Sequence, residues 1–153
     1  MPNTPGDLQT ALQVLDGYAS DMQHAIDGTG TAAENAIRHY VVHLDHEPIA
    51  SLAHAMLPPA DFDTWYKKAL ATQRSPRSSG NLNWPDDNTR ITLYAELLRR
   101  IARNEGLAFV ELIERFYDYQ PRRFDNGVAQ FARDFASFHR AFMRLVSGAH
   151  RAS

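Results

Sequence analysis

The sequence predicts an all-α fold, a single-domain bundle of five to six helices that spans residues 1–153. Hydrophobic residues repeat every three or four positions over long segments, which is the period of an α-helix, and no segment sustains the alternation of a strand. The ends of these segments coincide with glycine, proline or capping residues. With 44% hydrophobic and 22% charged residues, the 153-residue chain suits one domain with a substantial core.

The first predicted helix covers residues 7–27 and follows a flexible N-terminus at residues 1–6. Its hydrophobic residues are spaced alternately by four and three positions, which places them on one face of the helix. They are Leu8, Leu12, Leu15, Ala19, Met22 and Ile26. A Gly-Thr-Gly sequence at 28–30 ends this helix, because glycine is a poor helix former.

The second predicted helix covers residues 31–57 and contains a proline. A Thr-Ala-Ala-Glu capping box opens it. Pro48 lacks a backbone N–H, so we expect it to kink the helix or to split it near His46. A Pro-Pro pair at 58–59 then ends the segment.

Three shorter helices are expected on either side of a long internal loop. They cover residues 61–73, 89–104 and 107–119. The loop, residues 74–88, is rich in serine, asparagine, proline and glycine and cannot continue a helix. Asp87 or Asn88 is the expected N-cap of the helix that follows it. Trp84 is expected to fold back onto the core as a plug, with coverage of a ligand or partner site as the alternative.

The last predicted helix, residues 128–147, carries a seam of large hydrophobic side chains at a 3-4-3-4-3 spacing. This aromatic seam consists of Val128, Phe131, Phe135, Phe138, Phe142 and Leu145. The spacing places all six within about 100° on one face, so this face docks against other helices of the chain, against a partner, or both. An Asp-Asn-Gly break at 125–127 is expected before this helix, and Gly148 is its expected stop.

Composition excludes several classes of protein. The chain has no cysteine, hence no disulfide framework and no cysteine-based zinc site. No hydrophobic run reaches the roughly 18–20 residues that span a membrane, and residues 1–6 lack the features of a secretory signal, so we expect a cytoplasmic protein without a membrane partner. Phosphate-binding glycine loops, nucleophile elbows and paired carboxylates are also missing from the sequence.

Charge is distributed unevenly along the chain. Residues 1–89 hold 11 acidic and 5 basic residues, a net charge of −6, whereas residues 90–153 hold 7 acidic and 11 basic residues, a net charge of +4. Either the two halves attract each other when packed, or the basic half faces an anionic partner.

A histidine stripe marks the second predicted helix. His39, His43, His46 and His54 would lie within about 80° on an unbroken helix, on the side opposite its hydrophobic face. A polar surface that faces solvent or a partner accounts for this pattern. The alternatives are a metal site, with His39, His43 and His46 as candidate ligands, and a pH-sensitive surface.

An arginine ridge lies opposite the aromatic seam. Arg133, Arg140, Arg144 and Arg151 fall within about 40° of one another on the last helix. A solvated helix face explains them, and contact with the phosphates of RNA or DNA is the alternative, because guanidinium groups bind phosphate in a bidentate manner.

The same helix contains Arg133, Asp134 and, five residues further on, His139. An arginine, a polar residue and a histidine after a short helical gap resemble the motif of the HEPN ribonucleases. The resemblance implies a small helical domain that dimerises to form a metal-independent RNA-cleaving cleft. It implies that Arg133 would hold the scissile phosphate and that His139 would transfer protons to or from the ribose oxygens.

Taken together, these patterns favour a non-catalytic helical interaction or regulatory module that needs no cofactor. The expected partner is another protein, in a larger assembly or a homodimer. The metal-independent ribonuclease and a nucleic-acid-binding subunit that uses the arginine ridge are the alternatives.

Overall fold

The computed structural model describes residues 5–26, 30–73, 82, 84, 86–103, 109–117 and 124–152. Within these residues it contains seven α-helices, one π-helical turn and no strand. Their bounds are α1 Pro5–Ile26, α2 Gly30–Leu44, α3 Ile49–Met56, α4 Phe62–Ala71, α5 Asp87–Arg103, α6 Phe109–Leu112, η1 Ile113–Tyr117 and α7 Phe124–Ala152. The all-α prediction is confirmed, although the described helices number seven rather than five to six.

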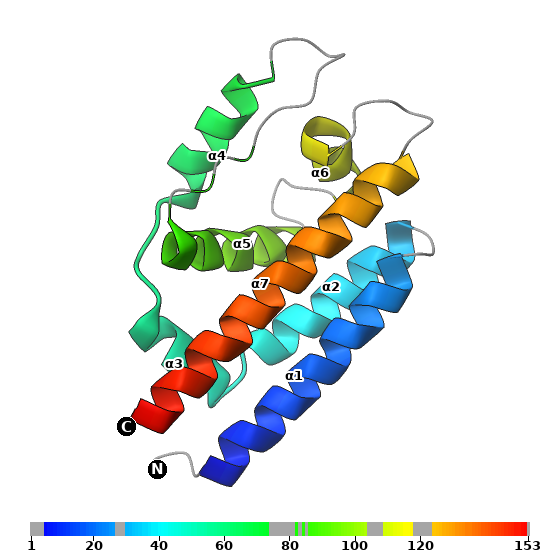
Figure 1. Cartoon of the computed structure of the whole chain (residues 1–153). Helices are drawn as coiled ribbons and strands as arrows, with labels where there is room; N and C mark the ends of the chain where they lie inside the picture. The colour runs from blue at the N-terminus through cyan, green and yellow to red at the C-terminus, as the bar shows by residue number, and fades with distance from the viewer. Residues whose placement is uncertain are drawn as a thin grey trace.

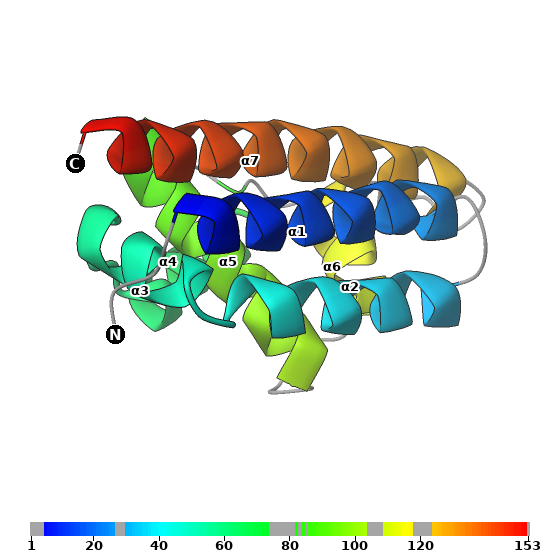
Figure 2. The ribbon, with the colours of Figure 1, turned by 90° about the horizontal axis from the view of Figure 1, so that it is seen from below.

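The three long helices α1, α2 and α7 run alongside one another, and α5 crosses behind them (Figures 1 and 2). The start of α1 and the end of α7 lie at the same end of this bundle (Figure 2). Helix α1 packs against α2 and α7, and α2 also packs against α5. Helix α3 packs against α7, while α4 packs against α5.

Pro48 explains the additional helix, because it splits the second predicted helix into α2 and α3. The Asp45 N–H still donates to the Val41 carbonyl at 2.9 Å, after which the chain turns. Pro48 has no N–H to continue the ladder. The next i to i−4 hydrogen bond runs from the Ala50 N–H to the His46 carbonyl at 3.0 Å, and α3 begins there as a separate helix.

Aspartates cap α4 and α5. Asp61 accepts from the Thr64 N–H at 3.1 Å, and Asp86 accepts from the Thr89 N–H at 2.8 Å. Both threonine hydroxyls donate to the same carboxylates, and these hydrogen bonds lower the pKa of each aspartate. The cap of α5 is therefore Asp86, and the prediction of Asp87 or Asn88 was wrong by one or two residues.

Helix α7 is longer than predicted at both ends. It begins at Phe124 and passes through Gly148 to Ala152, so neither the 125–127 break nor the glycine stop occurs. A glycine within a helix costs about 1 kcal/mol relative to alanine. Burial of the aromatic seam stabilises the helix by considerably more, and a Cβ at Gly148 would have no neighbour within 4 Å.

The aromatic seam forms the centre of the core. Phe131, Phe135, Phe138 and Phe142 are each at most 2% exposed. Tyr94 of α5 stacks on Phe138 at 4.8 Å between ring centroids, and Phe109 of α6 meets Phe131 edge-on at 5.1 Å. At the C-terminal end Val146, not Leu145, is the buried residue, and the side chain of Val128 lies outside the described residues.

Of the 74–88 loop, the structure describes Leu82, Trp84 and the cap region 86–88. The Trp84 ring stacks on Trp65 of α4 at 4.8 Å and lies 5.9 Å from the ring of Tyr94. The prediction that Trp84 plugs the core is confirmed. Residues 74–81 of this loop lie outside the described residues.

Among the described helices, none combines the length and the hydrophobicity that crossing a membrane requires.

Truncation of Phe135 tests the role of the seam. Because this side chain is fully buried, Phe135→Ala should lower the free energy of unfolding by about 3–5 kcal/mol, measured by urea denaturation followed by circular dichroism. Gln130→Ala, on the exposed side of the same helix, should change it by less than about 0.5 kcal/mol. Equal effects of the two variants would show that the seam does not form the core.

Candidate functional site

An open groove of about 840 Å³ lies between α3 and α5. Ala50, Ala53 and Leu57 of the α3 side, with Pro58 and Pro59, supply its apolar surface. Its volume lies within the range of ligand and peptide sites in proteins. Because a cavity of this volume is open to solvent and has apolar lining residues, the groove is the leading candidate for a binding site.

Polar side chains also line the groove. They are Asp45, Glu47, Ser51, His54, Thr92 and Arg99. The Thr92 hydroxyl donates to the Pro58 carbonyl at 2.9 Å, which ties the segment after α3 to α5 and fixes one side of the groove. The groove thus combines apolar lining residues with hydrogen-bonding and charged ones, as ligand sites commonly do.

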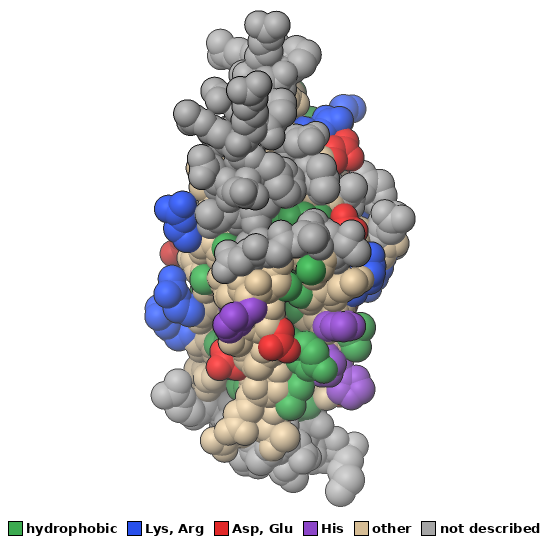
Figure 3. All heavy atoms as spheres, turned by 90° about the vertical axis from the view of Figure 1, so that its right-hand side faces the viewer, with side chains coloured by type: hydrophobic (Ala, Val, Ile, Leu, Met, Phe, Trp, Pro, Cys, Tyr) green, Lys and Arg blue, Asp and Glu red, His purple; other side chains and the backbone are tan. Residues whose placement is uncertain are grey.

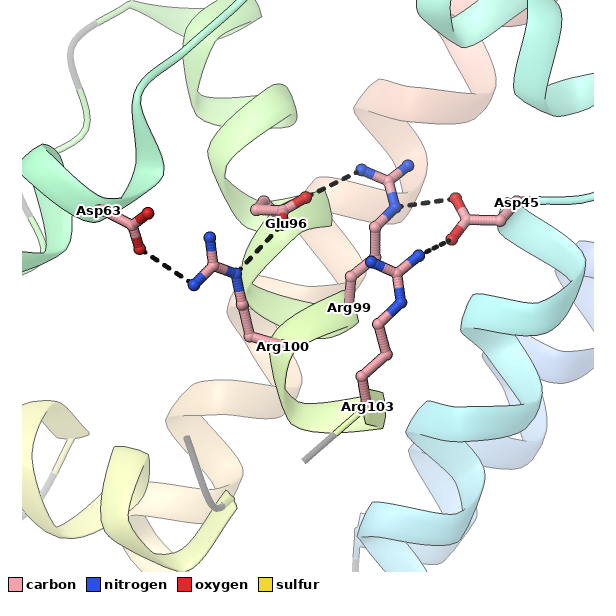
Figure 4. A network of polar contacts seen from close by, with 6 residues as sticks. All are labelled: Asp45, Asp63, Glu96, Arg99, Arg100 and Arg103. Carbon is pink, nitrogen blue, oxygen red and sulfur yellow. Dashed lines mark hydrogen bonds and ion pairs between the residues drawn. The ribbon is translucent and has the colours of Figure 1, made fainter. Parts of the chain in front are cut away.

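An ion-pair network connects the groove to the rest of α5 (Figure 4). Arg99 donates to Asp45 at 2.8 Å and lies 3.5 Å from Glu96. Arg103 reaches the second carboxylate oxygen of Asp45 at 3.5 Å. Asp45 follows directly after α2, so these contacts hold the end of α2 against α5.

The network continues to α4 through Arg100. Its guanidinium contacts Glu96 at 3.2 Å and Asp63 at 3.0 Å, and it lies 4.9 Å from the ring centroid of Phe62. The side-chain hydrogen bonds to Asp63 and Glu96 raise the pKa of Arg100. Six charged side chains therefore link α2, α4 and α5, and Arg99 enters the groove with its charge already neutralised.

The histidine stripe is divided by the turn at Pro48. His39 and His43 lie on α2 and His46 in the turn, whereas His54 lies on α3 and lines the groove. The His43 ring stacks on Tyr18 of α1 at 4.2 Å, and its Nδ1 lies 2.9 Å from the His39 carbonyl. Histidine and hydrophobic side chains are neighbours on the right-hand side of the molecule in Figure 1 (Figure 3).

Metal binding gains no support from this arrangement. Within the described part of the chain, no three histidine or acidic side chains come together in a way that could hold a metal ion. The candidate ligands His39, His43 and His46 instead occupy the polar surface and the turn after α2.

His139 is largely buried, with only 9% of its side chain exposed, and it lines a shallow depression beside the exposed Asp16. Its Nε2 is 2.9 Å from Asp16 of α1, and its Nδ1 is 2.9 Å from the hydroxyl of Tyr40 of α2. Because a carboxylate only accepts hydrogen bonds, Nε2–H donates to Asp16, and in the tautomer with its proton on Nε2 the Nδ1 atom accepts the Tyr40 O–H. One side chain of α7 thereby connects both neighbouring helices.

Tyr40 is fully buried, and desolvation together with the charge of Asp16 raises its pKa well above the ordinary value. The phenol therefore remains a hydrogen-bond donor at neutral pH. Both nitrogens of the His139 ring have partners, and the Tyr40 oxygen is inaccessible to a substrate. This geometry favours a structural role for the connection between Asp16, His139 and Tyr40.

The Arg133–Asp134–His139 motif is not assembled into one site within the chain. Arg133 and His139 are six residues apart, so their directions from the helix axis differ by about 120°. Asp134 accepts a hydrogen bond from the Tyr117 hydroxyl at 2.8 Å. The ribonuclease itself stays a prediction, but His139 is oriented toward α1 and α2.

The arginine ridge lies on the exposed side of α7 where it is described. Arg133, Arg140 and Arg144 are exposed, and the side chain of Arg151 lies outside the described residues. Arg140 also borders a shallow depression of about 210 Å³ that contains Asp16 and His139.

Sequence reasoning missed the groove and two of the three connected polar residues. Tyr40 falls on the hydrophobic face of α2, beside Ile37 and Val41, where an aromatic residue is expected to belong to the core. Asp16 directly follows a buried leucine, and no sequence signal links it to His139. The groove depends on the angle at which α3 leaves Pro48, which the sequence does not specify.

Comparisons with known proteins supply no further assignment. No family model matches this chain, and neither the curated proteins nor the solved structures yield a match.

Two tyrosine variants test the role of the hydrogen bond between Tyr40 and His139. Tyr40→Phe should cost about 1–3 kcal/mol, because it leaves the buried Nδ1 of His139 without a partner. The hydroxyl of Tyr94 is buried and has no hydrogen-bond partner among the described residues, so Tyr94→Phe should be neutral or stabilising. Urea denaturation of the two variants measures both effects. A loss for Tyr94→Phe as large as that for Tyr40→Phe would contradict the assignment.

Alkaline pH should unfold the protein through its buried tyrosines. Burial raises the pKa of Tyr40, Tyr94 and Tyr117 well above its ordinary value, and that of Tyr66 to about 12. Because the folded-state pKa is raised, the stabilisation is fully present below pH of about 10 and is lost as the pH rises further.

Phenolate absorbance and circular dichroism, recorded together from pH 8 to 13, measure this effect. Ionisation of the buried tyrosines should coincide with loss of helicity, whereas the chain in urea should ionise at pH of about 10. Ionisation of every tyrosine near pH 10 with helicity intact would show that these phenols are accessible.

Proposed function

We propose that the chain is a non-catalytic helical interaction module that receives a short segment of a partner protein in the groove between α3 and α5. The observation that carries the proposal is the groove itself, a cavity of about 840 Å³ lined by both apolar and polar side chains. Grooves of this kind accept the apolar side of a peptide segment and orient it through rim contacts.

Burial of the aromatic seam supports this location. The sequence leaves open whether the seam is covered by the chain itself or by a partner. Its phenylalanines are covered within the chain by α5, α6 and the neighbouring helices, so they are not available to another protein. A partner must therefore bind elsewhere, and the groove of about 840 Å³ between α3 and α5 offers a concave surface for it.

The state of His139 supports a binding role over the ribonuclease. A general acid or base must reach its substrate, whereas this imidazole is buried and bonded on both sides. A nucleic-acid-binding subunit is the second candidate, favoured by the exposure of Arg133, Arg140 and Arg144 along one side of α7. It implies binding to RNA or DNA that weakens steeply as the salt concentration rises.

Obstruction of the groove tests the proposal. Ser51 is exposed on α3 and lines the groove, so Ser51→Trp should fill part of it without entering the core. Gln9→Trp, on the exposed side of α1, is the matched control. Each protein is immobilised, and the proteins that it retains from a lysate of its source are identified by mass spectrometry.

At least one protein should be retained by the wild type and by Gln9→Trp, and lost at least about tenfold with Ser51→Trp. Thermal unfolding of the three proteins checks that the fold is intact. Retention of the same proteins in equal amounts by all three would place the interaction outside the groove.

A further inference from the structure

We propose that the segment held in the groove presents a lysine or arginine side chain to Glu47. This inference rests on the proposed function and specifies the chemistry of the partner. It follows from an account of the charges that line the groove and from the position of its apolar surface.

The ion-pair network contributes no net charge to the groove. Its three guanidinium groups, on Arg99, Arg100 and Arg103, are matched by the three carboxylates of Asp45, Asp63 and Glu96 (Figure 4). A ligand that competed for Arg99 would have to displace Asp45 at 2.8 Å and Glu96 at 3.5 Å. The groove is therefore poorly suited to an anionic ligand, in spite of the arginine that lines it.

Glu47 is the acidic residue of the lining that stands outside this network. It is exposed, and its carboxylate accepts a hydrogen bond from the Ser51 hydroxyl one helical turn further on. A neutral hydroxyl orients the carboxylate without neutralising it. Among the described residues no cation pairs with Glu47, so it leaves one uncompensated negative charge at the groove.

Apolar residues line the same groove as this charge. Glu47 lies in the turn before α3, Ala50 and Ala53 lie on α3, and Leu57 follows that helix. Lysine and arginine carry a long aliphatic stem that packs on apolar surface while the charged end remains near water. Such a side chain would satisfy both features together, and the remaining volume would accommodate the apolar neighbours of that residue in the segment.

The n-hexylammonium ion is a suitable probe, because it joins an aliphatic chain to a single ammonium group. Binding is followed by chemical-shift changes in ¹⁵N-labelled protein, with hexanol and hexanoate as neutral and anionic probes of the same length. The expected order of affinity is ammonium, then alcohol, then carboxylate, with the ammonium ion about two- to fivefold ahead of the alcohol. The largest shifts should fall on residues 47–58.

Two variants assign the preference to Glu47. Glu47→Gln should reduce the affinity for n-hexylammonium to that for hexanol, because it removes the charge and keeps the shape. Asp21→Asn removes an exposed carboxylate from α1 and should leave the ammonium preference unchanged. A preference that persists in Glu47→Gln, or that disappears equally in Asp21→Asn, would overturn the inference.

The outcomes separate this inference from the proposed function. If all three probes bind in the groove with equal affinity, the charge preference is wrong while the groove remains a binding site. If no probe shifts residues 47–58 and Ser51→Trp retains the same proteins as the wild type, both are wrong. If dilution of the wild-type protein alone shifts residues 47–58 and light scattering shows a dimer, the occupant is a second copy and the inference fails.

Discussion

Burial of the phenylalanine side of α7 is the constraint on which the other helices depend. Phe131, Phe135, Phe138 and Phe142 are each at most 2% exposed, and each contributes about 1.5–3 kcal/mol when it is removed from water. Rings from α2, α5, α6 and η1 cover it, while α1 and α3 also pack against α7. The same constraint explains why α7 continues through Gly148, since the intrinsic cost of one glycine is small beside this burial.

Polar contacts then fix how the helices are arranged around that surface. His139 donates to Asp16 at the surface and accepts from Tyr40 in the core, so it sets the position of α7 relative to α1 and α2. Buried polar groups with complete hydrogen bonding favour one arrangement over others, because any shift leaves a donor or acceptor without a partner. The chain of ion pairs from Asp45 to Asp63 has the same effect between α2, α5 and α4, where it is more exposed to solvent.

Local features were predictable from the sequence, whereas features that depend on helix angles were not. The seam and the split at Pro48 follow from periodicity and from the missing N–H, and both are confirmed. The predicted ends of α7 and the predicted N-cap of α5 were wrong. Tertiary packing extends α7 at both ends, and Asp86, rather than its neighbours Asp87 and Asn88, accepts the hydrogen bond from the Thr89 N–H. His139 was singled out for its chemistry, yet its partners come from helices 99 and 123 residues away in the chain. Pairings of this kind have no local signature.

The groove arises from the same break that sequence analysis located. Pro48 ends the α2 ladder and lets α3 turn away, while Asp45 remains held to Arg99 and Arg103 of α5. At the far side, the bond from Thr92 to the Pro58 carbonyl brings the chain back to α5. The segment between these two attachments must therefore stand apart from α5, and its small side chains, Ala50 and Ala53, are too short to fill the space. Glu47 lies in the turn that begins this segment, so a carboxylate without a cationic partner among the described residues lines the same groove as these apolar side chains.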